Sequence, residues 1–379
     1  MMIKRIKAEI SFIFILLGTV FNFSVSMSEA SGSEIPVRIG YFLGGRTALF
    51  YRAYINRDFD KEGVNLILCT KAIRDERIFD MPKDHKQVKE FYYGKIKNYG
   101  RVEGTRIIED MVKNRLQGGT VGESSFVLAV AQGAPIVAVA MLGHDGKTNP
   151  GKAIIVRNGC IIKRPEDFRG KTLVSRRAGP GDAIFLKEFV RHLGLDPGKD
   201  VKIIDGVDDK ETIRLLKHKK IDGGFYHVRH IYALIERDKA AYVYETMDKW
   251  MDPEISQAVL VFRKDFAAEH PEIVGKIVKT YMKRIASEGK LSQEEKLAYA
   301  RDYNMETHRE DLMEQRSLWY EGMDLPQCDY PPYLQIGQLN QIQDLLLKYN
   351  YIRQKADLVP FINNSWVNKI ADELNSNPK

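Results

Sequence analysis

Five glycine-rich turns carry the polar side chains whose types and spacing suit ligand binding. They span residues 43–47, 119–125, 143–146, 175–182 and 223–229. Glycine exposes backbone N–H groups, and a helix that begins at such a turn adds positive partial charge, so the turns favour anionic groups. The side chains predicted to bind a ligand are Arg46, Thr47, Glu123, Ser124, Ser125, His144, Ser175, Arg176, Arg177, Asp182, Tyr226, His227 and Arg229.

The arginines among these residues favour an anionic ligand. A planar guanidinium donates two hydrogen bonds at once to a carboxylate or sulfonate. We expect at least one of Arg176 and Arg177 to contact the ligand. A solvated surface charge or an internal ion pair is the alternative role for each arginine, and Glu123 is a candidate partner in such a pair.

The aromatic residues and the histidine leave the character of the ligand open. Tyr41 and Tyr226 suit either a hydrophobic core or stacking on a heteroaromatic ligand, whereas Phe42 is expected in the core. A lone histidine such as His227 is more often a buried structural residue. An apolar ligand also remains an alternative.

Motifs for catalysis, metals and nucleic acid are missing from the sequence. Two Gly-Lys-Thr triplets, at 146–148 and 170–172, lack the glycine that a phosphate-binding loop places five positions earlier, and no GxSxG or HExxH occurs. The three cysteines are far apart, without a CxxC pair, so no zinc site is predicted and one disulfide is at most possible. Lysines do not cluster with aromatics on one face of a predicted strand, which argues against nucleic acid as a partner. We predict no catalytic residue, metal or cofactor.

The first thirty residues have the order of a secretory signal. Basic residues precede an apolar run over 10–21, and small polar residues follow over 24–30, with cleavage expected after Ser26 or Ala30. The run is shorter than the roughly 20 residues that span a bilayer, which disfavours a membrane anchor. Removal of residues 1–30 takes away three basic and two acidic residues, so the formal net charge falls from +7 to +6. We expect an exported, periplasmic protein.

The remaining chain alternates strands with helices, which predicts an α/β fold. A chain of 379 residues with 44% hydrophobic residues is too long for one core, so two lobes are expected. Strands are predicted at 37–42, 64–68, 136–141, 153–156, 171–175, 201–204, 224–227 and 258–262, and helices at 47–61, 105–116, 183–193, 208–219 and from 271 onward. Asp182 is expected to be the N-cap of its helix, and Ser292 and Glu295 form a predicted capping box.

Two segments suggest that the lobes are built alike. Residues 106–119 and 211–224 each read as a helix, an apolar-polar pair and then Gly-Gly. By contrast, residues 71–103 show neither a helical nor a strand pattern, and we interpret them as a surface insertion that could line or cover the ligand site.

Four segments, in their order along the chain, resemble a known family. They are VRIGYFLGG (37–45), GGTVGESSFVLAVAQGAP (118–135), RPEDFRGKTL (164–173) and PEISQAVLVFRKDFAAEHPEIV (253–274). They resemble extracytoplasmic solute-binding proteins of ABC importers, in the branch for nitrate, sulfonates and taurine that includes thiamine-pyrimidine synthase relatives. The family usually has Asp where this chain has Gly118 or Gly119.

The resemblance implies a type II periplasmic binding fold, in which two α/β lobes close over a solute in the cleft. Lobe 1 would comprise 36–147 plus 253–379 with a helical C-terminal tail, and lobe 2 would comprise 148–252, joined by crossovers near 144–152 and 247–257. The implied partners are a small solute, a membrane permease and its ATPase, and the protein would be a monomer. A ligand-sensing or scaffold protein is the alternative, and a pyrimidine-synthase-like enzyme is a weaker one, because the cysteine-rich run of those relatives is missing.

Overall fold

The computed structural model describes residues 35–376 apart from 43, 72–75, 95–103, 147–150, 177–178, 208, 228–237, 293, 297, 300–301 and 303–326. The described residues belong to one unit, Ile35–Lys379. The predicted export signal lies outside them. No helix among the described residues is both long and apolar enough to cross a membrane.

The first sheet has six strands, in the order β3-β2-β1-β4-β11-β5. The strands are β1 Val37–Gly40, β2 Leu66–Thr70, β3 Phe79–Asp80, β4 Gly118–Gly122, β5 Ile136–His144 and β11 Gln257–Arg263. β1 pairs in parallel with β2 and β4, whereas β11 lies antiparallel between β4 and β5. The parallel strands bring their carboxyl ends, and the turns that follow, to one edge of the sheet.

The second sheet has five strands, in the order β10-β6-β9-β7-β8. These are β6 Lys152–Arg157, β7 Thr172–Ser175, β8 Lys202–Ile204, β9 Gly223–His227 and β10 Ala241–Thr246. β7 pairs in parallel with β8 and β9, and β6 lies antiparallel between β9 and β10. Both sheets therefore share one feature: an antiparallel strand, β11 or β6, is inserted beside a strand that starts with Gly-Gly. The first sheet has a further antiparallel strand, β3, at its edge.

The paired glycines are required by close backbone approach in both sheets. A Cβ on Gly118 would lie 2.6 Å from the carbonyl oxygen of Val261, and one on Gly223 would lie 2.2 Å from that of Ile155. In each case the oxygen belongs to the inserted antiparallel strand. The internal similarity of 106–119 and 211–224 thus corresponds to equivalent positions in the two sheets.

Sixteen helical segments are described along the unit. The α-helices are α1 Ala48–Ile55, α2 Asp58–Lys61, α3 His85–Gly94, α4 Gly104–Val112, α5 Glu123–Ala131, α6 Pro180–His192, α7 Asp209–Lys217, α9 Lys264–Glu269, α10 Pro271–Gly289, α12 Ile336–Lys348 and α13 Ser365–Ser376. Short 3₁₀ helices are η1 Gly45–Thr47, η2 Pro165–Phe168, η3 Met247–Lys249, η4 Pro253–Ile255 and η7 Val359–Phe361. The predicted capping box forms, since Ser292 N–H donates to Glu295 Oε2 and Glu295 N–H to Ser292 Oγ.

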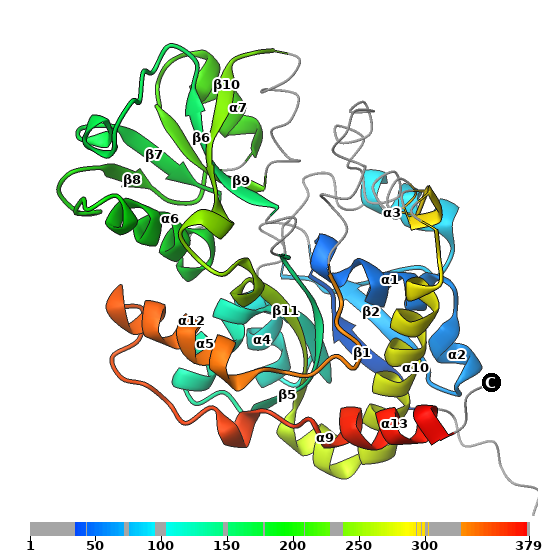
Figure 1. The fold of residues 1–379 in the computed structure, drawn as a ribbon. Helices are drawn as coiled ribbons and strands as arrows, with labels where there is room; N and C mark the ends of the chain where they lie inside the picture. Colours follow the sequence, from blue (N-terminus) through cyan, green and yellow to red (C-terminus); the bar gives the residue numbers. More distant parts are fainter. Residues whose placement is uncertain are drawn as a thin grey trace, which may run out of the picture. The chain divides into compact units, whose positions relative to one another are not determined.

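Helices cover both faces of the first sheet (Figure 1). Successive side chains of β11 point to opposite faces of the sheet, so they pack into two different cores. Val259 and Val261 pack with residues of α4, α5 and α12, whereas Leu260 and Phe262 pack with residues of α1, α10 and α13. The inserted strand is therefore buried on both faces, which explains its almost wholly apolar sequence.

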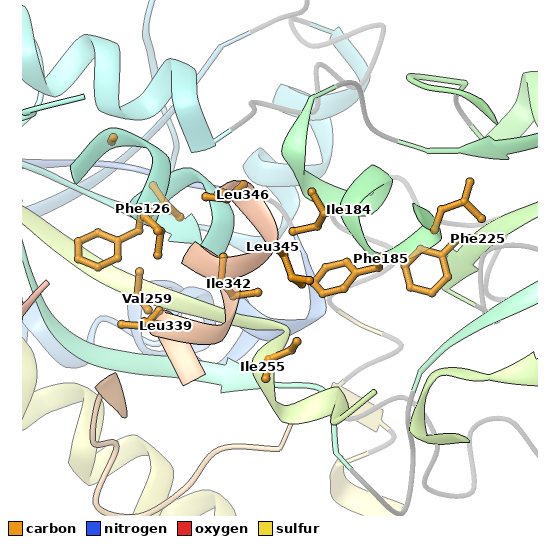
Figure 2. Close-up of a cluster of buried hydrophobic side chains, with 14 of the residues drawn as sticks. Phe126, Ile184, Phe185, Phe225, Ile255, Val259, Leu339, Ile342, Leu345 and Leu346 are labelled. Atoms are coloured by element: carbon orange, nitrogen blue, oxygen red, sulfur yellow. The ribbon is translucent and has the colours of Figure 1, made fainter. Parts of the chain in front are cut away.

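One apolar cluster joins the helices of the two sheets (Figure 2). Its members include Phe126 of α5, Leu345 of α12, Ile184 and Phe185 of α6, and Phe225 of β9. Helix α12 contacts α5, η4 and α6. The C-terminal helix α12 thus contributes to the core beside both sheets.

The chain passes between the sheets twice. Residues 145–151 connect β5 to β6, and residues 247–256 connect β10 back to β11. The predicted crossovers lie near these connections, while the division into two lobes that move as bodies stays a prediction.

The interpretation of 71–103 as lacking regular structure is wrong for its described part. β3 pairs antiparallel with β2, and α3 follows it. Met81, Val88 and Tyr92 are buried in the core that contains α1 and α10. Their apolar positions are separated by charged residues, which hid the helical period. Strand β10 was not predicted either, because only its first residue is buried and its tyrosines are partly exposed.

Candidate functional site

Arg46 lies at the carboxyl edge of the first sheet, in the short helix η1. Its Nη1 atom donates to Glu123 Oε2 at 3.0 Å, to Ser256 Oγ at 3.0 Å and to the carbonyl oxygen of Gln257 at 2.8 Å. Glu123 is the first residue of α5, where a negative charge is stabilised by the helix N-terminus. The arginine therefore connects the turn after β1 with the start of α5 and the second crossover.

Lys152 is a central residue that the sequence interpretation missed. It begins β6, and its side chain is almost fully buried. Its Nζ atom donates to Ser256 Oγ at 2.5 Å and lies 3.5 Å from Asp145 Oδ2 and 3.9 Å from Asp182 Oδ1. Ser256 thus receives hydrogen bonds from both Lys152 and Arg46.

Arg176 is connected to Lys152 through the carboxylate of Asp182. Its Nε atom donates to Asp182 Oδ2 at 3.2 Å, and both side chains are buried. Asp182 lies in the first turn of α6, whose N-cap is Gly179. The prediction that Asp182 is the N-cap is therefore wrong: the helix begins at Pro180 with Gly179 as its N-cap, and Asp182, in the first turn, accepts a hydrogen bond from Arg176.

Two phenyl rings flank the lysine. Lys152 Nζ lies 4.9 Å from the ring centroid of Phe185 and 5.8 Å from that of Phe225. Aromatic faces attract a cation, most strongly where water is excluded. The lysine is therefore held by both charge and packing.

The six charged side chains named above form what we call the central ion cluster: Arg46, Lys152, Arg176, Glu123, Asp145 and Asp182. Its three cations and three carboxylates balance. Burial lowers the pKa of Lys152, and Arg46 lowers it further, while Asp145, Asp182 and Glu123 raise it. The cluster links the carboxyl edges of both sheets through Ser256.

The other predicted residues lie in structural contacts near these edges. Thr47 Oγ1 lies 2.7 Å from the carbonyl oxygen of Phe42 and closes the turn after β1. Ser124 Oγ donates to Glu123 at 3.4 Å. Ser125 packs against Gly104, since a Cβ there would lie 2.8 Å from its Oγ.

The remaining predicted side chains point to other partners. His144 contacts Asp329 Oδ1 through Nε2 at 3.3 Å, so it faces the C-terminal segment. Ser175 Oγ donates to Asp205 at 3.1 Å, and Tyr226 donates to the carbonyl oxygen of Val207 at 3.1 Å within a separate small core. His227 is half-buried and pairs with Lys152 in the strand register. Arg177 and Arg229 lie outside the described residues, and Phe42 is buried as expected.

The missed residues had a weak signal in the sequence. Lys152 is a single charged residue at the start of an otherwise apolar strand, and Asp145 and Ser256 lie in the two crossovers. Pairing among them depends on two chain segments more than 100 residues apart. The three cysteines are free, and burial raises the pKa of Cys69 and of Cys328 to about 12.

A family model and a curated protein each match about half of the chain. A model of the family described as NMT1/THI5 like matches residues 103–286. The chain is 27% identical over 177 residues to the taurine-binding periplasmic protein of Escherichia coli (strain K12), a match that covers 47% of this chain and 52% of that protein. The matched region thus spans about half the length of that curated relative.

Solved structures share the fold. A putative periplasmic sulfonate-binding protein of an ABC transporter from Methylobacillus flagellatus KT has a TM-score of 0.63 at 17% identity, covering 91% of this chain and 96% of its own. The desulfurization enzyme DSZB has a TM-score of 0.56 at 12% identity, with 89% and 99% covered. The fold is therefore the two-sheet α/β fold of periplasmic binding proteins. Residues 103–286, somewhat less than half of the chain, are similar to the NMT1/THI5-like family.

Proposed function

We propose that this protein is the substrate-binding component of an ABC importer and captures a small sulfonate-, taurine- or nitrate-like solute. One observation carries the proposal: the central ion cluster connects the carboxyl edges of both sheets through Ser256, at the two crossovers. A ligand that inserts here contacts both sheets at once. Its binding energy then stabilises one relative placement of the sheets, as hinge closure requires.

Binding is a better fit than covalent catalysis. A nucleophilic cysteine needs a lowered pKa and solvent access. Cys69 is buried and its pKa is raised to about 12, as is that of Cys328. The central ion cluster places charged side chains of both signs at the edges of the two sheets, and such groups can bind a polar solute through hydrogen bonds. Export to the periplasm and delivery to a membrane permease belong to the same proposal, supported by the taurine-binding relative.

A thermal-shift series tests the binding function. The purified protein is heated with taurine, ethanesulfonate or nitrate at increasing concentration. A ligand that binds only the native state stabilises it by about 2.7 kcal/mol at 100 times its Kd, so Tm rises with the logarithm of concentration. We expect at least one probe to raise Tm and to be recovered unchanged by mass spectrometry. No shift with any probe contradicts the proposal, and turnover of a bound probe contradicts a purely binding role.

A further inference from the structure

Lys152 has hydrogen-bonding capacity that its neighbours do not fill. An ammonium group has three N–H donors. Among the described residues, only Ser256 Oγ accepts a hydrogen bond from Nζ, at 2.5 Å. The nearest carboxylate oxygens, on Asp145 and Asp182, lie at 3.5 and 3.9 Å, which is ion-pair distance rather than a good hydrogen bond.

Asp145, in turn, has a carboxylate oxygen that lacks a hydrogen-bond donor among the described residues. Its side chain is only 9% exposed, and its Oδ2 atom is buried without a hydrogen-bond donor in the described part of the chain. A buried acceptor left without a donor costs free energy, and most such atoms in proteins find a partner. The oxygen without a donor is the same atom that lies 3.5 Å from Lys152 Nζ.

The arginines of the central ion cluster are matched more closely. Arg46 donates to Glu123 at 3.0 Å, and Arg176 donates to Asp182 at 3.2 Å. The Lys152–Asp145 pair is looser than these two, because its N···O distance is 3.5 Å and Asp145 Oδ2 has no donor among the described residues. The cluster is also neutral as a whole, so a ligand with a net charge would leave that charge unbalanced in a buried setting.

We propose that the Lys152–Asp145 pair is a subsite for a small zwitterion. The ligand's anionic group accepts hydrogen bonds from Lys152 Nζ, and its ammonium group donates to Asp145 Oδ2. One loose ion pair is replaced by two charge-assisted hydrogen bonds, and the cluster stays neutral. The inference rests on the proposed binding function and narrows its ligand to an amino-sulfonate or amino-carboxylate, in preference to a simple anion.

The position of the pair fits this exchange. Asp145 directly follows β5 of the first sheet, and Lys152 begins β6 of the second. The two residues are therefore the ends of one crossover. A ligand that enters between them separates these ends, so binding at the subsite is coupled to the placement of one sheet against the other.

Matched probes test the subsite by isothermal titration calorimetry. Taurine and ethanesulfonate differ only in the amine, as do β-alanine and propionate. We expect at least one zwitterion to bind tenfold or more tightly than its amine-free counterpart. Asp145→Asn keeps the size of the side chain but removes its charge, so we expect it to reduce that ratio toward one. Lys152→Met is expected to abolish binding of both members of a pair.

An exposed ion pair of the same residue types provides the control. Asp344 and Lys355 pair on the surface, with about half of each side chain exposed. Asp344→Asn and Lys355→Met should leave both affinities and their ratio unchanged. The affinity ratio within one variant does not depend on the fraction of folded protein, so Asp145→Asn remains informative even if it is less stable.

The possible outcomes separate the subsite from the proposed function. An amine-free probe that binds as tightly as its zwitterion overturns the subsite and leaves the binding function standing. The subsite is also overturned if Asp145→Asn lowers the affinities for the zwitterion and for its amine-free counterpart by the same factor. If none of the four probes and no nitrate binds, the proposed function fails, and the subsite fails with it.

Discussion

At the residue scale, the central ion cluster shows how a buried lysine is accommodated. The Lys152 ammonium is removed from water, which is costly for an ion. Three carboxylates, one hydroxyl and two aromatic rings surround it and offset that cost in part. The net effect still favours the neutral amine relative to water, since burial is the largest influence on its pKa.

The buried lysine predicts a pH dependence of stability. Its pKa in the native protein is lowered from the ordinary 10.5, so between the two values the unfolded chain binds more protons than the native protein. The unfolding free energy contributed by Lys152 therefore rises with pH across that interval and is constant below it. We expect the unfolding free energy of Lys152→Met to lack this rise with pH.

Urea unfolding at a series of pH values up to about 10.5 checks this. The quantity compared is the difference in unfolding free energy between the native sequence and Lys152→Met. Tyr54 and the other tyrosines whose pKa burial raises contribute an opposite slope, but they do so in both proteins and cancel. A difference that stays constant with pH would contradict the prediction.

At the element scale, equivalent glycines and one C-terminal helix determine how strands and helices meet. Gly118 and Gly223 allow the inserted strands β11 and β6 to lie against their neighbours. Helix α12 then covers α5 and reaches α6. Each feature joins segments far apart in sequence, so each can be tested by a single substitution.

The first element prediction concerns Gly223. An added methyl group would meet the carbonyl oxygen of Ile155 at 2.2 Å, and that oxygen is held in the β6–β9 ladder. We expect Gly223→Ala to lower the unfolding free energy by about 1–3 kcal/mol or more. Gly337→Ala is the control, because nothing lies within 4 Å of its added Cβ in α12, and it should raise the free energy by roughly 0.4–1 kcal/mol. Equal effects of the two variants in urea unfolding would contradict this reading.

The second element prediction concerns Leu345 of α12. Its side chain is buried in the cluster that also contains Ile184 and Phe185 of α6 (Figure 2). We expect Leu345→Ala to cost about 2–5 kcal/mol of unfolding free energy, because the truncation leaves a cavity. Ile336→Ala, at the exposed start of the same helix, should change it by about 0.5 kcal/mol or less. A small effect of Leu345→Ala would mean that α12 does not contribute to the joint core.

At the scale of the whole molecule, one hydrophobic cluster extends beside both sheets. It contains Val259 and Val261 of the first sheet together with Ile154 and Phe225 of the second. A shared core makes the stability of each sheet depend on the other. The change in sheet placement that we propose for ligand binding must therefore leave this cluster intact.

The shared cluster predicts cooperative unfolding. We expect one calorimetric transition in which the calorimetric and van't Hoff enthalpies agree, because unfolding of either sheet removes part of the cluster that they share. Differential scanning calorimetry of the ligand-free protein is the measurement. Two resolved transitions would show that the sheets are stabilised independently.

The sequence by itself determined the α/β class, most strands and helices, and the family resemblance. These depend on local periodicity, glycine placement and the order of motifs, all of which are readable along the chain. It also predicted that Arg46, Glu123, Arg176 and Asp182 lie just after strands. The structure has Arg46 in η1, Glu123 and Asp182 in the first turns of α5 and α6, and Arg176 directly after β7. Whether they bind a ligand stays a prediction.

Only the tertiary structure decided how those charges are paired. Arg176 is matched by Asp182 six residues away, but Lys152 meets Ser256 from the opposite crossover, 104 positions further along the chain. A buried charge is stable only where partners converge in space, and convergence across two sheets leaves no periodic pattern in the sequence. The preference for an anionic ligand was inferred from arginines on single turns. The balance of three cations and three carboxylates in the central ion cluster depends on contacts between segments that only the fold brings together.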